Sequence, residues 1–253
     1  VKMNLNSILS INRTGLNGLQ NNLDNVSHNI ANENTVGYKG IINSFNELMN
    51  NNLTNSDGAL GNSNARVDSN TGLNAAGARV DDQVGKFETT GRALDMAING
   101  NAFFGIIGPD GNTYLTKAGD FHRDANGGLI ASNGYRVAVD ARVPEQNWPA
   151  GDLKVSSDGT IRSGDQVLGS LRLFEPNNAH SLVSVGDNLY LANGGFRAAG
   201  AGSSVMQGTL ESSNVDLATQ MTELLTAQRS YQMNARAASS TDEMMETINH
   251  FTD

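Results

Sequence analysis

The side chains that could carry catalytic or metal-binding chemistry are few in this sequence, and their spacing does not bring them together. There are four His, at positions 28, 122, 180 and 250, and no Cys. None of the His stands at a metal-ligand spacing from another His or from a close carboxylate. Without Cys there are no thiolate ligands, thiol nucleophiles or disulfides. We therefore predict no catalytic residue, no metal site and no cofactor.

The remaining chemical candidates are better explained as turns and packing. Asp81, Asp82, Asp110 and Asp124 could suggest a calcium site, but none follows the spacing of an EF-hand loop. Asp is common in turns, where its side chain bonds to nearby backbone groups. The sequence has no GxSxG, HExxH or phosphate-binding loop. The single Trp148 is expected to pack within a loop rather than to bind a ligand.

The charge balance excludes a further class of partner. The 253 residues include 17 Lys and Arg against 26 Asp and Glu, a formal net charge of −9. Nucleic acids and anionic membranes are bound by basic surfaces, so neither is an expected partner. No apolar run approaches the roughly 20 residues of a membrane-spanning helix. The first residues also lack the apolar core of a cleaved signal peptide.

The elements that organise the chain are its two ends. From Leu5 to about Asn34, apolar residues recur with the average spacing of 3.5 that is typical of a coiled-coil seam. Asn12 is the one polar position in that seam. A helix of about 30 residues is roughly 45 Å long and needs a matching partner. The predicted seam residues are Leu5, Leu9, Leu16, Leu19, Leu23, Val26 and Ile30.

The outer face of this first helix is rich in Asn, at positions 6, 17, 21, 22, 25, 29 and 32. Asn is a poor helix former because its side chain competes for the backbone. Two interpretations stay open. The Asn content could reflect an Asn-rich sequence in general, as the tract at 50–55 suggests. Alternatively, this face packs against other subunits and the helix is stable only then, which is the interpretation that we favour.

A second heptad pattern occupies the C-terminal end, over about residues 216–250. Its predicted seam residues are Leu217, Met221, Leu224, Tyr231, Ala235, Ala238 and Met245. Ser213 or Asn214 is the expected N-cap, since Ser and Asn side chains accept bonds from the first free N–H groups of a helix. The two terminal helices are similar in length and period. We therefore predict that they pair as a coiled coil.

Between the helices the period changes to that of β-strands. From about Val80, short alternating segments are separated by turn signals such as Asn99-Gly100 and Asn133-Gly134. The predicted fold class is α+β, with long terminal helices around an antiparallel β-rich middle domain. The expected organisation is residues 1–40 for the first helix and its closing turn, 41–79 for a linker or loop, 80–195 for the β-rich domain, 196–211 for a connector and 212–253 for the C-terminal helix.

Four groups of residues, in order along the chain, resemble motifs of the bacterial flagellar rod and hook protein family. The middle ones are residues 90–104 and 114–121, and the last comprises residues 210–216 and 228–232. The first is similar to the N-terminal signature of the family, although His28 stands where the family usually has Asn. Its signature residues here are Asn29, Ala31, Asn32, Asn34, Thr35, Gly37, Tyr38 and Lys39.

The resemblance implies a structural subunit. Family members are exported by the flagellar type III apparatus without a cleaved signal peptide, and they polymerise into a helical, tubular drive shaft that transmits torque to the hook. Their terminal helices form the inner layer and their β domain the outer one. The expected location is the flagellar basal body. The expected partners are further copies of the chain, other rod subunits, the hook protein, the export apparatus and the bushing rings.

Other interpretations remain within and outside this family. Length and C-terminal helix are most similar to the distal-rod members, and a proximal-rod subunit with a β domain is the alternative. From a different class, the rival is a secreted β-domain adhesin or binding protein with a helical oligomerisation stalk. An enzyme is the weakest interpretation.

Overall fold

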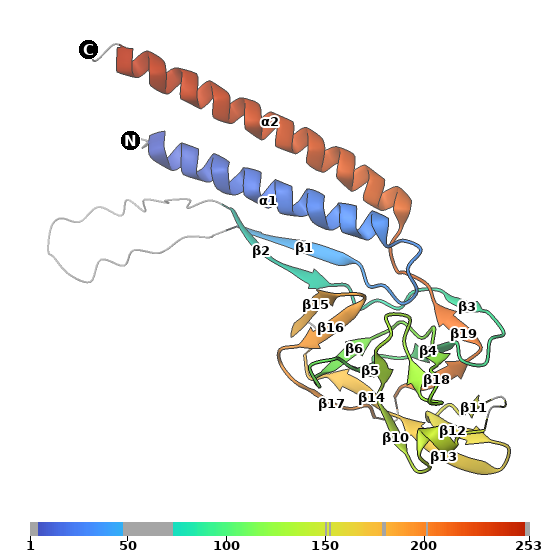
Figure 1. Cartoon of the computed structure of the whole chain (residues 1–253). Helices are drawn as coiled ribbons and strands as arrows, with labels where there is room; N and C mark the ends of the chain where they lie inside the picture. The colour runs from blue at the N-terminus through green and yellow to red at the C-terminus, as the bar shows by residue number, and fades with distance from the viewer. Residues whose placement is uncertain are drawn as a thin grey trace, which may run out of the picture. The chain divides into compact units, whose positions relative to one another are not determined.

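The computed structural model describes residues 5–47, 73–149, 151, 153–178, 181–200 and 202–250. The chain divides into two compact units. We call them the helical unit (residues 1–27, 43–78 and 221–253) and the β unit (residues 28–42 and 79–220). The fold class is α+β, with one long helix near each end of the chain and a β-rich middle of antiparallel strands (Figure 1).

The two helices are α1 (Leu5–Ala31) and α2 (Leu217–His250). Helix α1 ends three residues before the predicted Asn34, because a turn begins where the Asn32 side chain donates to the carbonyl oxygen of His28 at 2.8 Å. The N-cap of α2 is Asp216, whose Oδ1 accepts a bond from the N–H of Thr219 at 2.7 Å. The expected caps Ser213 and Asn214 lie before it in the chain.

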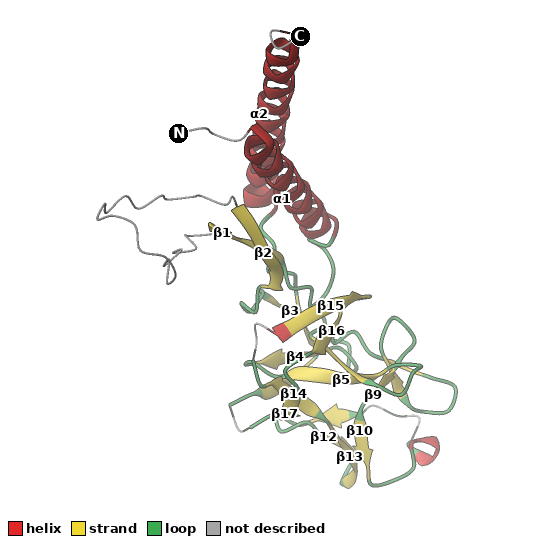
Figure 2. Ribbon diagram, turned by 90° about the vertical axis from the view of Figure 1, so that its left-hand side faces the viewer, coloured by secondary structure: helices red, strands yellow, loops and turns green. Residues whose placement is uncertain are grey.

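Within the helical unit, α1 and α2 lie side by side (Figures 1 and 2). The side-chain amide of Asn234 lies 3.5 Å from the carbonyl oxygen of Asn12, and a Cβ on Gly15 would come within 2.7 Å of the same amide nitrogen. Small and polar residues therefore bring the helices close at this point.

The least exposed residues of α1 include several of the predicted seam residues, together with Gly18 and Asn29, which were not among them. Val26 is buried, and Leu16, Leu19, Leu23 and Ile30 are half-buried. The side chains of Leu5 and Leu9, like that of Met245 in α2, lie outside the described residues.

The least exposed face of α2 consists of two sets of positions, each stepping by seven residues. One set agrees in position with the predicted residues, and the other does not. The predicted residues Leu217, Leu224, Tyr231 and Ala238 are half-buried, as is Ala235. The second series lies one residue earlier than expected, at positions 220, 227, 234 and 241. Ala227 and Thr241 are 3% and 5% exposed, whereas the predicted Met221 is 46% exposed. Small and polar side chains occupy this series, so it does not stand out in a search for apolar residues alone.

The segment expected to be a linker contains two strands. β1 (Ile41–Glu47) and β2 (Leu73–Val80) form a two-stranded sheet. β2 overlaps the loop that was predicted for residues 50–78, and residues 48–72 lie outside the described residues. The low apolar content of this segment did not exclude a strand, because the backbone supplies the bonds of a sheet.

The remaining strands belong to the β unit, and their described pairs are antiparallel. They are β3 (Phe87–Thr89), β4 (Met96–Asn99), β5 (Phe103–Ile107), β6 (Thr113–Thr116), β7 (His122–Arg123), β8 (Leu129–Ile130), β9 (Arg136–Val137), β10 (Val139–Ala141), β11 (Lys154–Val155), β12 (Thr160–Ser163), β13 (Gln166–Leu171), β14 (Leu173–Pro176), β15 (Leu182–Gly186), β16 (Leu189–Ala192), β17 (Phe196–Ala198), β18 (Ser204–Gln207) and β19 (Thr209–Glu211), with a short 3₁₀ turn, η1 (Glu145–Asn147).

The strands form one large sheet and several small ones. The large sheet has the order β15-β16-β6-β5-β9-β8-β7, with β14 also beside β5 and β17 beside β14. A four-stranded sheet has the order β10-β13-β12-β11. Strands β18 and β19 return late in the chain to pair with β4 and β3. The expected connector at 196–211 therefore contains β17, β18 and β19, and the β unit continues to Gln220.

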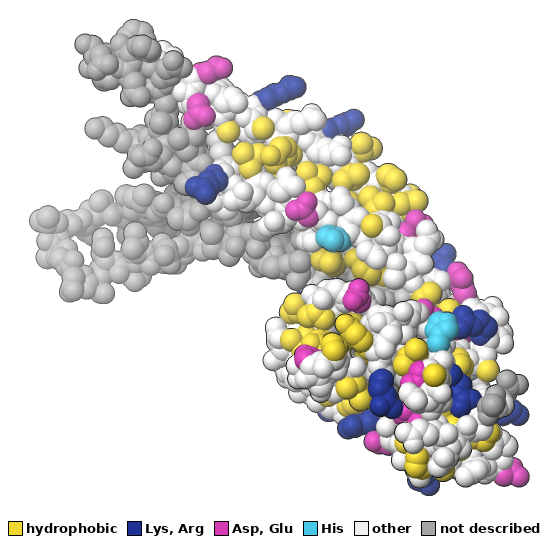
Figure 3. Space-filling view, viewed as in Figure 1, with side chains coloured by type: hydrophobic (Ala, Val, Ile, Leu, Met, Phe, Trp, Pro, Cys, Tyr) yellow, Lys and Arg dark blue, Asp and Glu magenta, His cyan; other side chains and the backbone are white. Residues whose placement is uncertain are grey.

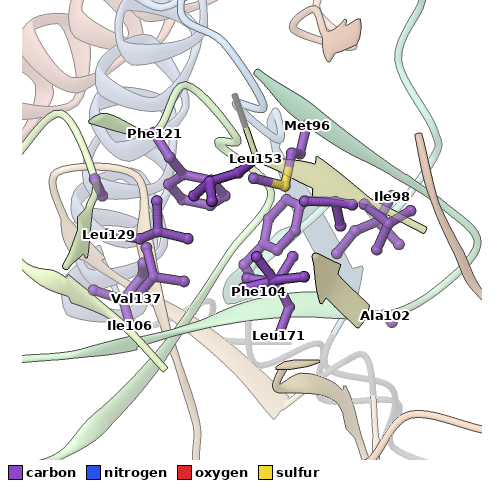
Figure 4. Close-up of a cluster of buried hydrophobic side chains, with 14 of the residues drawn as sticks. Met96, Ile98, Ala102, Phe104, Ile106, Phe121, Leu129, Val137, Leu153 and Leu171 are labelled. Atoms are coloured by element: carbon purple, nitrogen blue, oxygen red, sulfur yellow. The ribbon is translucent and has the colours of Figure 1, made fainter. Parts of the chain in front are cut away.

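The main core of the β unit is a cluster of buried apolar side chains from several strands (Figure 4). The rings of Phe104 and Phe121 meet edge to face, with centroids 4.9 Å apart. Trp148 packs against this cluster at 5% exposure, and its indole N–H donates to the carbonyl oxygen of Val143 at 2.9 Å. This arrangement agrees with the loop-packing role expected for Trp148.

Candidate functional site

The signature segment lies in the β unit, where it meets the segments 81–86 and 211–220; we call this assembly of residues the signature junction. Asn29, only 4% exposed, connects its parts. Its amide nitrogen donates to Oε1 of Gln220 at 2.9 Å and to the carbonyl oxygen of Ile41 at 3.0 Å. Its Oδ1 accepts from the N–H of Ile41 at 2.8 Å and from the Tyr38 hydroxyl at 3.2 Å. One side chain thus joins the last turn of α1 to the first turn of α2. Asn29 had been expected on an outer face.

Gly37 provides the turn between α1 and β1. Its φ of +65° lies in the left-handed region, and its N–H donates to the carbonyl oxygen of Glu211 at 2.6 Å. A Cβ at this position would overlap the backbone of Lys117 and Ala118. Both observations require glycine. The following residue, Tyr38, is 8% exposed, and burial raises the pKa of its hydroxyl.

Lys39 and Glu211 form a buried ion pair at the centre of the junction. The Lys39 Nζ lies 2.6 Å from Oε1 of Glu211, and the two side chains are 1% and 0% exposed. Lys39 Nζ also donates to the carbonyl oxygen of Gln83 at 2.5 Å, and Oε1 of Glu211 accepts from the N–H of Gly85 at 2.8 Å. A buried charge is tolerated when it is paired and hydrogen-bonded. The pair therefore fixes the segment around Gln83 and Gly85 against the end of β19.

A second buried cation, Lys117, lies close to this pair. It is 3% exposed, its Nζ donates to the carbonyl oxygen of Gly100 at 2.7 Å, and it lies 5.0 Å from the centroid of the Phe103 ring. Burial lowers the pKa of Lys117 to about 8, although the carboxylate of Glu211 acts in the opposite direction. Lys with such a pKa can serve as a base. Here its amine is engaged by a carbonyl group and an aromatic ring, which indicates a structural role.

Two further side chains complete the junction. Oδ1 of Asn214 accepts from the N–H of Gly40 at 2.8 Å, and its amide nitrogen lies 3.2 Å from the carbonyl oxygens of both Asp81 and Gln83. The Tyr190 hydroxyl accepts from the N–H of Lys39 at 3.2 Å.

The partners of the signature residues were not among the predicted site residues, although Asn214 was expected as a helix cap. These partners are Glu211, Asn214, Gln220, Gln83 and Tyr190. Glu211 and Asn214 stand in the C-terminal motif at 210–216, so a signal was present for these two. Gln83 contributes through its backbone, and no side-chain pattern could have marked it.

The remaining signature residues divide into two groups. Thr35 donates to Oδ1 of Asn32 at 3.1 Å and so shapes the turn. Ala31 and Asn34 are exposed, and the Asn34 side chain makes no hydrogen bond within the described part of the chain. These two positions face outward from the junction.

The residues considered for metal chemistry are turn residues or exposed side chains. Oδ1 of Asp81 accepts from the N–H of Gln83, and Oδ1 of Asp124 accepts from the N–H groups of Asn126 and Gly128. His28 and His122 are exposed; His180 and the side chain of His250 lie outside the described residues. Over the described ranges, no three His, Asp or Glu gather as metal ligands would. Neither α1 nor α2, as far as each is described, could span a membrane.

The fold and the junction define a class of protein by architecture: an α+β chain in which a buried polar junction joins the last turn of α1 to the first turn of α2. Comparison with known proteins adds the role. Residues 9–39 match the family described as flagella basal body rod protein, and residues 97–163 match the D1 domain of flagellar hook protein FlgE/F/G. Residues 206–250 match the C-terminal family of the flagellar basal body rod FlgEFG proteins.

Individual relatives match along almost the whole chain. The flagellar basal-body rod protein FlgG of Agrobacterium fabrum is 33% identical over 258 residues, which cover 95% of this chain and 97% of the relative. FlgG of Bacillus subtilis is 31% identical, with 93% and 95% covered. FlgF of Mesorhizobium japonicum is 30% identical, with 91% and 92% covered. The chain therefore belongs to the flagellar basal-body rod protein family, in its FlgG or distal-rod type, and is a structural subunit of the bacterial flagellum.

Proposed function

We propose that this chain polymerises into the helical, tubular distal rod and transmits torque to the hook, and that it catalyses no reaction. In the polymer, α1 and α2 pair as a coiled coil in an inner layer and the β unit faces outward. The predicted seam residues of both helices are the proposed assembly surface. Rod subunits and the hook protein are its neighbours, and the bushing rings surround it. The type III apparatus exports the chain without a cleaved signal peptide. Membership of the rod family favours this function over that of an adhesin.

The observation that carries the proposal is a second apolar face on α2. Met221, Leu225, Met233 and Met244 are 46%, 57%, 65% and 54% exposed. At 3.6 residues per turn they fall within an arc of about 140°, on the side away from Ala227 and Tyr231. Hydrophobic side chains follow α2 in the space-filling view (Figure 3). An exposed apolar stripe of this length marks an interaction surface, and Met adapts readily to a partner.

The test is Leu225→Asp in the full chain. Leu225 is exposed in the single subunit, so the β unit keeps its fold, while burial of an unpaired carboxylate in the polymer costs at least about 2 kcal/mol. The critical concentration for polymerisation, measured by sedimentation and electron microscopy, should rise at least about 30-fold.

Leu225→Met is the matched control and should polymerise like the wild type. A wild-type chain that stays monomeric at all accessible concentrations, or a Leu225→Asp chain that polymerises normally, contradicts the proposed function.

A further inference from the structure

A groove of about 550 Å³ lies in the β unit beside the signature junction. Its walls come from the signature segment (Glu33, Asn34 and Val36), from residues 83–90 and from residues 210–216. Among its apolar side chains, Val84 is 45% exposed. Its charged side chains are Glu33, Glu88 and Asp216 against Lys86, which gives three negative charges, one positive charge and a formal net charge of −2. The groove is therefore both acidic and partly apolar.

The junction holds this groove in shape. A Cβ on Gly85 would overlap the carbonyl oxygen of Ser212, so the two segments lie in direct contact. The N–H of Ser212 donates to the carbonyl oxygen of Lys86 at 2.8 Å, and the N–H of Gly85 donates to Glu211 at 2.8 Å. A partner would meet a preformed surface, which lowers the entropic cost of binding.

Two of the three acidic side chains in the groove make no ion pair or hydrogen bond within the described part of the subunit. Asp216 caps α2 through the N–H of Thr219. The carboxylates of Glu33 and Glu88 make no ion pair and no hydrogen bond within the described residues. Glu33 also lies within the signature segment, next to the outward-facing Asn34. These carboxylates are available to a cationic partner.

The complementary charges lie on the outward face of α2. Arg229 and Arg236 are exposed and make no ion pair with a described acid. They are seven residues apart, which is roughly 10 Å along the helix, and they fall on the same arc as Met221, Leu225 and Met233. From Leu224 to Thr241 the helix contains no acidic residue. In Figure 3, Lys or Arg side chains stand beside the hydrophobic ones along α2.

We propose that the outward stripe of α2 (Met221, Leu225, Arg229, Met233 and Arg236) docks on the acidic groove beside the signature junction of a second copy of the chain. This inference rests on the proposed function and names the partner of the same stripe. Both surfaces combine apolar groups with charges of opposite sign, and an Arg guanidinium bonds well to carboxylates. Because the two surfaces differ, the contact is heterologous and can repeat without closing into a dimer. It also gives the exposed part of the signature segment a function.

The test uses charge reversal on each surface of the full chain. R229E/R236E makes both surfaces acidic, and E33K/E88K makes both basic. Either chain alone should show a critical concentration at least tenfold above that of the wild type. An equimolar mixture of the two should polymerise with the subunits alternating. A chain with all four changes should return to within threefold of the wild type. R142E, which reverses an exposed charge elsewhere on the β unit, is the matched control and should leave the critical concentration unchanged.

The outcomes separate this contact from the proposed function. If the wild type polymerises and both double variants polymerise equally well, or if neither the mixture nor the fourfold variant is rescued, the docking contact is wrong while the rod function stands. Rescue in the mixture also shows that both variants fold. If the wild-type chain never polymerises, both the proposed function and this contact are wrong.

Discussion

Glu211 is the residue on which the signature junction converges. Its carboxylate pairs with Lys39 and accepts from Gly85, and its backbone carbonyl accepts from Gly37. Oε2 of Glu211 is buried and has no hydrogen-bond partner within the described residues. Such a pair is not in itself a large source of stability, because desolvation offsets much of the attraction. Removing only one charge of the pair is costly, because the other charge is then buried without a partner.

Glu211→Gln should therefore destabilise the β unit by about 3–5 kcal/mol, the usual cost of breaking a buried ion pair from one side. Urea unfolding followed by the fluorescence of Trp148, the single Trp of the chain, measures this value. The double variant Lys39→Met with Glu211→Gln removes both charges and should cost less than Glu211→Gln alone. A loss below about 1 kcal/mol for Glu211→Gln, within the range of a surface change, contradicts the role of the pair.

Lys117 gives the junction a measurable pH dependence. Burial lowers its pKa from 10.5 to about 8 in the folded state. Between these two values the unfolded chain binds more protons than the folded one, so the free energy of unfolding rises with pH. Relative to Lys117→Met, the wild type should gain about 2 kcal/mol between pH 7.5 and 9.5, at about 1.4 kcal/mol per pKa unit crossed. Urea unfolding of both chains at the two pH values tests this, and a constant or falling difference contradicts it.

At the scale of elements, the turn after α1 depends on Gly37. Gly111 offers a matched comparison, because its φ of +78° is similar but a Cβ there meets no atom within 4 Å. Gly111→Ala should cost about 1–2 kcal/mol, the strain of a left-handed residue alone. Gly37→Ala adds the overlap with the Lys117 backbone and should cost at least about 3 kcal/mol. Urea unfolding measures both values. Equal losses in the two variants would show that the close approach of the turn to Lys117 is unimportant.

The elements also show how far the sequence could predict the structure. The terminal helices were predicted from apolar spacing, and their start positions at Leu5 and Leu217 agree within one residue. The second seam series of α2 was displaced by one residue, because Ala227 and Thr241 are not large apolar residues. Strands β2, β17, β18 and β19 were missed for other reasons. Ala, Gly and Asn dominate β2, which hides its β pattern. β17, β18 and β19 have only three or four residues each, and β18 and β19 pair with β4 and β3, far away in the sequence.

The candidate site was predicted in part. Asn29, Gly37, Tyr38 and Lys39 were selected through a family resemblance, and they form the junction. Asn29 also bonds to Tyr38 and Ile41 nearby, but the partners outside the segment lie between 44 and 191 residues away, as for Lys39 with Gln83 and Asn29 with Gln220. A local pattern carries no information on such contacts, since the fold alone brings these residues together.

At the scale of the whole molecule, the division of the chain differs from the expected five segments. Residues 28–40 were placed with the first helix, but they belong to the β unit, together with the first turn of α2. The bond between Asn29 and Gln220 thus fixes one end of each helix within a folded unit. Starting a helix is the costly step of its formation, and a fixed first turn removes much of that cost. Beyond this turn α1 is rich in Asn, a poor helix former. We therefore infer that the long helices are weakly formed in the free subunit and extend from their fixed ends during assembly.

Hydrogen exchange of the free chain and of its polymer tests this account most directly. In the free chain, amides in residues 28–42 and 211–220 should be protected, while those in residues 5–27 and 225–245 should exchange nearly as fast as in an unfolded chain. In the polymer both helices should become at least 100-fold better protected. Strong protection throughout residues 5–27 before assembly, or no gain over α2 after it, would contradict the account.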